Sequence, residues 1–132
     1  MNDPSYGLTR ELPDADFDTA IQRVTDALKT EGFGVLTRID VHETLRARLG
    51  VDLPPYAILG ACNPKLAHQS LQAEPWIGLL LPCNVVVRAL DGGGTAVSIA
   101  HPAAMFRVVD NPDMGPLVAD VESRLRNALA RV

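Results

Sequence analysis

The stretch CNVVVRALDGGGTAVSIAH, residues 83–101, decides between the two folds that the rest of the chain allows. Two β-rich segments flank Asp91-Gly92-Gly93-Gly94, which is a typical hairpin turn. A three-residue loop with a glycine in the left-handed position is a common connection, and its register puts the apolar side chains on one face. That register opposes three pairs of residues: Leu90 and Gly94, Val87 and Val97, Val85 and Ile99. The glycines join two strands, whereas a phosphate-binding loop leads from a strand into a helix.

The residues before the hairpin predict alternating strands and helices. Asp16 and its neighbours suit the start of a helix, Asp40 begins a D-x-x-E capping box, and Asn63-Pro64 is a strong helix start. Apolar spacing places Val41, Leu45 and Leu49 on the inward face of the second helix. The predicted strands cover 5–12, 33–39, 56–62, 83–90 and 95–101, and the predicted helices cover 17–31, 41–49, 64–74 and 116–132.

The resulting order, β-α-β-α-β-α-β-β-α, fits either a parallel α/β sheet or an α+β fold. Two observations favour α+β. The last two strands must pair as an antiparallel hairpin, and several strands alternate apolar and polar residues, which is typical of a sheet with one open face. We therefore predict a five-stranded, mainly antiparallel sheet with helices packed on one face.

The composition is that of one ordinary globular domain spanning residues 1–132. Apolar residues make up 47% and charged residues 21%, with a net charge of −4. Lys and Arg are scattered, so the chain offers no basic footprint for nucleic acid or for an anionic membrane. No apolar run approaches the roughly 18 residues of a membrane span. The polar N-terminus resembles no signal peptide, so we expect a cytoplasmic protein whose thiols stay reduced.

The two cysteines and one histidine form the candidate site. Cys62 precedes the predicted helix start at Asn63, where unpaired amides favour a thiolate. The hairpin register makes Cys83 and His101 cross-strand neighbours on the core face, about 5 Å apart at Cβ. Thiolates and imidazole suit soft metal ions, so Cys62, Cys83 and His101 are candidate metal ligands, and Asn63 joins them as a candidate ligand-binding residue.

The signal is not specific, because the chain has no C-x-x-C motif and only two thiols. Buried cysteines often fill small gaps in a core, and a histidine at a strand end often binds backbone groups. His42 and His68 are expected to face solvent. Met105 and Phe106 are expected to pack near His101. No particular cofactor is indicated.

Several blocks resemble the bacterial family called domain of unknown function 302. They are GFGVLTRIDV, YAILGACNP, LAHQSLQAEPWIGLLLPCNVVV and HPAAMF, and the most specific are LGACNP and LLLPCNVVV. The resemblance covers nearly the whole chain. It implies a five-stranded antiparallel sheet with helices on one face, similar to the TATA-binding-protein half-domain, and a homodimer. It implies no activity, and the fold relation does not imply DNA binding here.

Three hypotheses follow. The first is a binding module that holds a small ligand or soft metal ion near Cys62, Cys83 and His101. The second is a thiol-based redox or catalytic protein that uses Cys62, with Cys83 as its resolving partner. The third is a purely structural, dimeric interaction domain with ordinary core cysteines.

Overall fold

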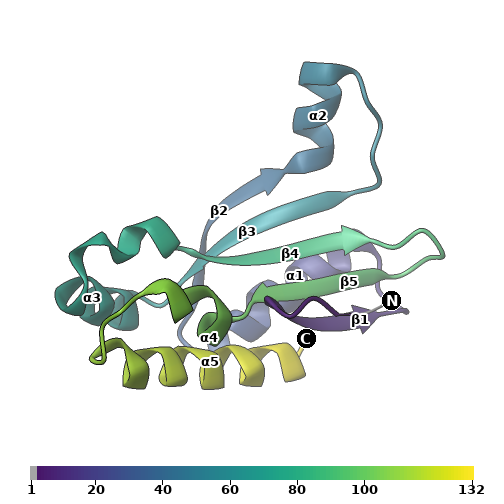
Figure 1. The fold of residues 1–132 in the computed structure, drawn as a ribbon. Coiled ribbons are helices and arrows are strands. Elements are labelled where there is room, and N and C mark those ends of the chain that lie inside the picture. The colour runs from purple at the N-terminus through teal and green to yellow at the C-terminus, as the bar shows by residue number, and fades with distance from the viewer. Residues whose placement is uncertain (1–2) are drawn as a thin grey trace.

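The computed structural model describes residues 3–132 and shows one open sheet of five strands with helices, an α+β fold (Figure 1). The order across the sheet is β1-β5-β4-β3-β2, and every neighbouring pair is antiparallel. The strands are β1 (Gly7–Leu12), β2 (Gly34–Asp40), β3 (Tyr56–Cys62), β4 (Cys83–Ala89) and β5 (Thr95–Ala100).

The central hairpin has the predicted register. Val85 faces Ile99 and Val87 faces Val97, and all four side chains are fully buried. The Leu90 amide donates to the Gly94 carbonyl at 3.0 Å, which closes the loop. Gly93 has φ +98°, the left-handed conformation that the predicted loop requires and that a side chain would disfavour.

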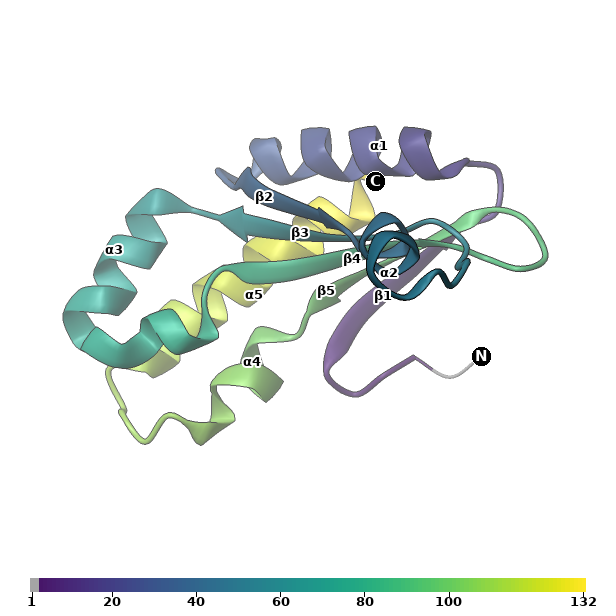
Figure 2. The same cartoon turned by 90° about the horizontal axis from the view of Figure 1, so that it is seen from above.

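The helices α1 and α5 contact each other and cover one face of the sheet (Figure 2). Each presents an apolar stripe, with Val24 and Leu28 of α1 and Leu125 of α5 completely buried against the strands. The helical elements are α1 (Phe17–Thr30), α2 (Val41–Leu49), α3 (Pro64–Ala73), α4 (Pro102–Met105), α5 (Met114–Ala130), and the 3₁₀ segments η1 (Pro75–Leu80) and η2 (Phe106–Val108). Neither 3₁₀ segment is predicted individually from the sequence. In the region described, no helix is long and apolar enough to cross a membrane.

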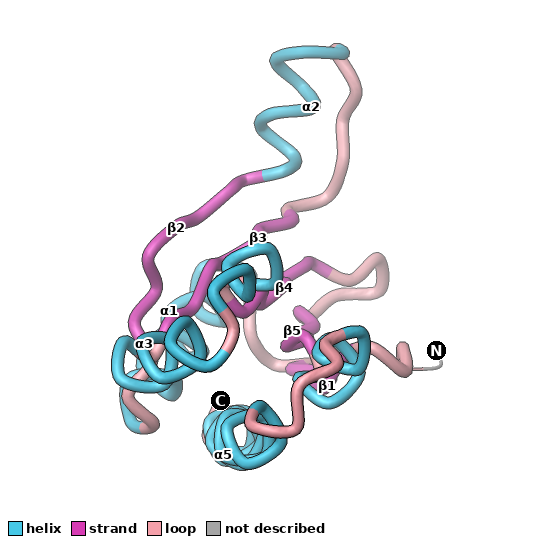
Figure 3. Tube along the Cα trace, turned by 60° about the vertical axis from the view of Figure 1, so that its left-hand side comes forward, coloured by secondary structure: helices cyan, strands magenta, loops and turns pink. Residues whose placement is uncertain are grey.

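The second helix corrects the sequence prediction. Helix α2 projects beyond the end of the sheet opposite to α3 (Figures 1 and 3), and none of its residues is buried. Leu49, predicted to point inward, is 70% exposed. The Asp40 side chain makes no capping hydrogen bond and instead pairs with Arg38 at 3.0 Å. The apolar spacing was correct for a helix, but β2 carries that helix past the surface it would need to cover.

His42 attaches α2 to the body of the protein. Its Nδ1 accepts a hydrogen bond from the Tyr56 amide at 3.0 Å, and its ring meets the Phe17 ring edge-on at 5.7 Å. The prediction that His42 faces solvent is therefore wrong, because the folded chain returns to it at the start of β3. His68 is exposed, as expected.

The edge strand β2 is irregular. Its pairing with β3 shifts register between Val35 and Thr37, which leaves Leu36 bulged outward and 67% exposed. A bulge of this kind bends an edge strand and interrupts its regular row of hydrogen-bonding groups.

Candidate functional site

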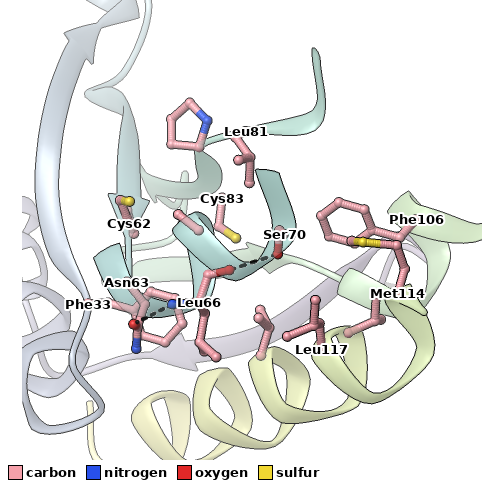
Figure 4. Close-up of a pocket in the computed structure, with 15 residues that line it drawn as sticks. Phe33, Cys62, Asn63, Leu66, Ser70, Leu81, Cys83, Phe106, Met114 and Leu117 are labelled. Atoms are coloured by element: carbon pink, nitrogen blue, oxygen red, sulfur yellow. Dashed lines mark hydrogen bonds between the residues drawn. The ribbon is translucent and has the colours of Figure 1, made fainter. Parts of the chain in front are cut away.

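An apolar pocket lies between the end of the sheet, α3 and α5 (Figure 4). Its cavity is about 30 Å³, enough for one or two water molecules and far less than the several hundred Å³ of a typical ligand site. A second cavity of about 130 Å³ adjoins it, and the two share Leu81, Pro82, Cys83 and Phe106. The remaining walls of the first cavity come from the ends of β3, α3 and α5, for example Ala61, Leu66, Ser70, Leu117 and Val121.

Cys83 stands between the two cavities. It begins β4 on the same face as Val85 and Val87, and it is largely but not completely buried. Burial, with a smaller contribution from the neighbouring Cys62, raises the pKa of the Cys83 thiol to about 11. At pH 7 the thiolate is then only on the order of one part in ten thousand. Cys83 is therefore a neutral thiol, with weak donor character and little nucleophilicity.

Cys62 is next to Cys83 in the sheet but is not aligned with it. The register pairs Cys83 with Ala61, and Cys62 pairs with Gly34 on the other side. Since successive side chains of a strand point to opposite faces, the two cysteines leave opposite sides of the sheet. Figure 4 shows the sulfur of Cys83 directed toward Ser70 and that of Cys62 directed elsewhere. Both cysteines are free thiols.

Asn63 has a structural role at the junction of two helices. Its Oδ1 accepts a hydrogen bond from the Leu66 amide at 3.2 Å, which is the predicted N-cap of α3. Its Nδ2 donates to the Glu31 carbonyl at the end of α1, also at 3.2 Å. A Cβ on Gly32, which has φ +81°, would come within 2.9 Å of this amide nitrogen. Both polar ends of the Asn63 side chain are thus occupied by protein groups.

His101 lies outside the pocket. The β4–β5 pairing extends from Ala89 only to Val85, and His101 does not border either cavity that Cys83 borders. The backbone amide of His101 donates to the Tyr6 carbonyl at 2.9 Å. Its ring contacts Glu122 through Nε2 at 2.9 Å and the Ser5 carbonyl through Nδ1 at 3.3 Å. The structure therefore brings together the two cysteines and Asn63 but leaves His101 apart.

A metal centre is not preformed in the part of the chain that the structure describes. Residues 3–132 contain no group of three or more His, Cys, Asp or Glu side chains placed to hold a metal ion. The two thiols leave opposite faces of the sheet, so both could bind one ion only after a rearrangement. A third donor would have to come from a rearrangement or from outside the chain.

Glu122, on α5, is a residue that the sequence analysis did not single out. Its Oε1 accepts from the Ala103 amide at 3.3 Å and faces His101, and its Oε2 accepts from Arg126 at 3.2 Å. Burial alone would raise the pKa of this carboxyl group, but the hydrogen bonds from Ala103 and Arg126 and the nearby positive charges lower it overall. The i,i+4 spacing of Glu122 and Arg126 was visible in the sequence, whereas the contacts with His101 and Ala103 depend on the fold.

Comparisons with known proteins give the family but no activity. A family described as "Domain of unknown function DUF302" matches residues 8–132. A crystal structure of an uncharacterized conserved DUF302 protein from Bacillus stearothermophilus is 32% identical, with a TM-score of 0.88, over 97% of this chain and 98% of that one. A comparison with curated proteins finds no match. The sequence resemblance is thus confirmed, and the chain belongs to the DUF302 family.

Proposed function

We propose that the protein is a binding module for a small apolar molecule, held in the pocket between the sheet end, α3 and α5. The observation that carries this proposal is the apolar cavity of about 30 Å³ that adjoins a larger, more polar cavity of about 130 Å³ across Cys83, and a ring-sized ligand needs the space of both. Well-packed cores leave few such voids, and a concave apolar site with a few polar groups is the usual form of a ligand pocket.

The polar groups at the pocket limit what it can hold. The thiol of Cys83 is neutral, and the hydroxyl of Ser70 already donates to the Leu66 carbonyl at 2.8 Å. Neither group neutralises an anion, so the ligand is expected to be uncharged where it meets this wall. A soft metal ion is a second form of the proposal, in which Cys62 and Cys83 serve as donors after a rearrangement brings their sulfurs to the same side of the sheet. His101 could become a third donor only by leaving Glu122 and Ser5.

Binding is favoured over thiol redox chemistry. A resolving cysteine has to reach its partner's sulfur, and a disulfide needs Cβ atoms about 4 Å apart with suitable vectors. Side chains on opposite faces of the sheet do not meet this requirement. The high pKa of Cys83 also removes the thiolate that would attack a mixed disulfide.

The test uses indole as an uncharged, ring-sized probe, with amide chemical shifts as the readout. Shifts should concentrate on α3, β4 and α5 in the wild type. Ala67→Leu narrows the pocket and should reduce indole affinity at least fivefold, whereas Ala47→Leu, on exposed α2, should leave it unchanged. Scattered shifts, or equal effects of the two variants, would contradict the proposal.

Metal content measured on the same preparation distinguishes the metal form of the proposal. That form requires a stoichiometric soft metal ion in the wild type and its loss in Cys83→Ser.

A second candidate function is that of a dimeric interaction domain, and the observation that favours it is the projecting arm formed by residues 36–55. Its helix has nine residues and buries none of them, and isolated helices of this length are marginal in water. The arm exposes five large apolar side chains: Leu36, Ile39, Leu49, Val51 and Leu53. An exposed apolar surface of this kind is typical of an interface.

The partner proposed for the arm is a second copy of the chain. The opposite end of the molecule has an end patch of Trp76, Leu79 and Val108, each more than three-quarters exposed, beside Glu74 and Asp110. The last turn of α2 carries two arginines, Arg46, which pairs with Asp52 of the arm at 3.5 Å, and Arg48. The apolar surface of the arm and the positive charge of Arg48 therefore match the patch, and a two-fold axis lets each arm cover the partner's patch.

Charge reversal tests this arrangement. Arg48→Glu and Asp110→Arg should each weaken self-association, because each places like charges at both equivalent contacts. Mixing the two variants should restore a heterodimer in which both contacts are complementary, as measured by light scattering and analytical ultracentrifugation. A monomeric wild type would refute the dimer. Dimeric single variants would place its interface elsewhere.

A further inference from the structure

We propose that α4 and η2, residues 102–108, form a lid over the pocket, that the Glu122 carboxylate holds this lid closed, and that the Phe106 ring occupies the place of a ring-sized apolar part of the ligand. The inference builds on the proposed binding function. It adds the route of entry and a ligand class, an uncharged molecule with an aromatic or similarly flat apolar end.

Phe106 is the first observation. Its half-buried ring borders the 30 Å³ cavity, the neighbouring 130 Å³ cavity and a third, open hollow of about 400 Å³ on the outer side of the segment. Phe106 borders all three spaces, whereas Leu81, Pro82 and Cys83 border the first two, and Met114 and Val118 border the first and third. Moving the Phe106 ring would widen the Cys83 pocket toward both its neighbour and the open hollow, and the vacated space would match a flat ring.

The second observation is how the segment is attached. At its start, Glu122 accepts a hydrogen bond from the Ala103 amide and faces the His101 ring. At the far side, the Asn111 amide donates to the Ala73 carbonyl at 2.9 Å and to Glu74 at 3.3 Å. The attachments thus lie at the two ends of the segment. Each attachment includes a carboxylate acceptor, and hydrogen bonds to a carboxylate are stronger than those between neutral groups. Glu122 is the one that contacts both the start of the segment and the His101 ring.

The third observation is weak packing between these attachments. Within α4 and η2, Pro102 is the buried residue, and Val108 is 78% exposed. Segments with few buried contacts open at a lower free energy than the core does. Strands β4 and β5 and helix α5, by contrast, carry fully buried side chains, so opening can be confined to the lid.

The ring of His101 also connects Glu122 to the segment that precedes β1. Its two ring nitrogens face two acceptors, the Glu122 carboxylate and the Ser5 carbonyl. A neutral imidazole carries one N–H and can donate to only one of them, whereas the protonated ring donates to both. The charged groups around this ring are Glu122 and, beyond it, Arg126, both on α5.

Alkylation of Cys83 measures lid opening directly, because this thiol lies beneath the segment. The experiment uses the full chain with Cys62→Ser, so that Cys83 is the one reactive thiol, and the uncharged reagent N-ethylmaleimide. Glu122→Ala should raise the alkylation rate at least tenfold, and Glu122→Gln, which keeps an acceptor oxygen, should raise it less. Asp120→Ala removes a similar ion pair from the same helix without touching the lid, so it should leave the rate unchanged.

Urea separates lid opening from unfolding. If the lid opens locally, the faster rate of Glu122→Ala should depend little on low urea concentrations, since little surface is exposed. Equal rates for Glu122→Ala and Asp120→Ala, or a rate that follows global unfolding, would overturn the inference. The indole titration remains a separate readout. Indole binding with unaltered alkylation would refute the lid alone, and faster alkylation without indole binding in any variant would refute the proposed ligand.

Discussion

Helices α1 and α2 have similar sequence signals but differ in whether they pack against the sheet. Each follows an aspartate and carries apolar residues at helical spacing, yet α1 buries four residues and α2 buries none. The Asp16 side chain caps α1 by accepting from the Thr19 amide at 2.8 Å, whereas Asp40 pairs with Arg38. The comparison shows that an apolar stripe specifies a helix, while the length and direction of the preceding strand decide whether the stripe finds a surface to cover.

Truncating the core of α1 is the strongest way to test this difference. Leu28 is fully buried, so Leu28→Ala should lower the free energy of unfolding by about 2–5 kcal/mol, through lost apolar burial and the cavity left behind. Urea denaturation would measure the loss. A decrease in the free energy of unfolding of less than about 1 kcal/mol would mean that packing against the sheet stabilises α1 no more than α2.

The sheet end that carries Cys83, opposite to α2, should respond to alkaline pH. The folded-state pKa of Cys83 is raised to about 11, so the folded state keeps its proton where the unfolded chain loses it. The stabilisation, about 2–3 kcal/mol, should be fully present below about pH 9 and lost as the pH rises through 11. Denaturation at several pH values would show this fall in the wild type and a smaller one in Cys83→Ala, whose remaining decline reports other groups.

Asn63 connects the well-packed helix α1 to α3, the helix that lines the pocket. Asn63→Ala removes the α3 cap and the hydrogen bond to the end of α1, and it should cost about 1–2 kcal/mol. Asp40→Ala is the matched control, because Asp40 precedes α2 without a capping hydrogen bond. Equal losses in the two variants would show that the double contact of Asn63 contributes little.

The smallest effect is expected on α2 itself. Leu49 is 70% exposed, so Leu49→Ala should change the unfolding free energy of the monomer by less than about 0.5 kcal/mol. The same substitution should weaken self-association if the arm covers a second copy. A large loss of monomer stability would show that α2 packs on the body after all.

The parts of the fold that were predictable depend on local signals. The three glycines after Asp91 impose the hairpin, and Asn63-Pro64 starts α3, because turn and cap chemistry act over a few residues. The fate of Leu49 and the contacts of His42 and His101 depend on where distant segments meet. Glu122 is 21 residues from His101 in the chain, and no spacing rule relates them. The site was predicted in part: Cys62 and Cys83 are neighbours, but alternation along the strands separates their side chains.

The bulge in β2 has a consequence for how copies of this protein can meet. A straight edge strand could accept the same strand of another molecule and grow into an endless ladder, the route by which many sheets form fibrils. The shift between Val35 and Thr37 breaks that template at its middle. Contacts at this edge are thereby directed to side chains, which can be complementary, finite and reversible, so a ladder that grows through both edges of the sheet is interrupted at every β2.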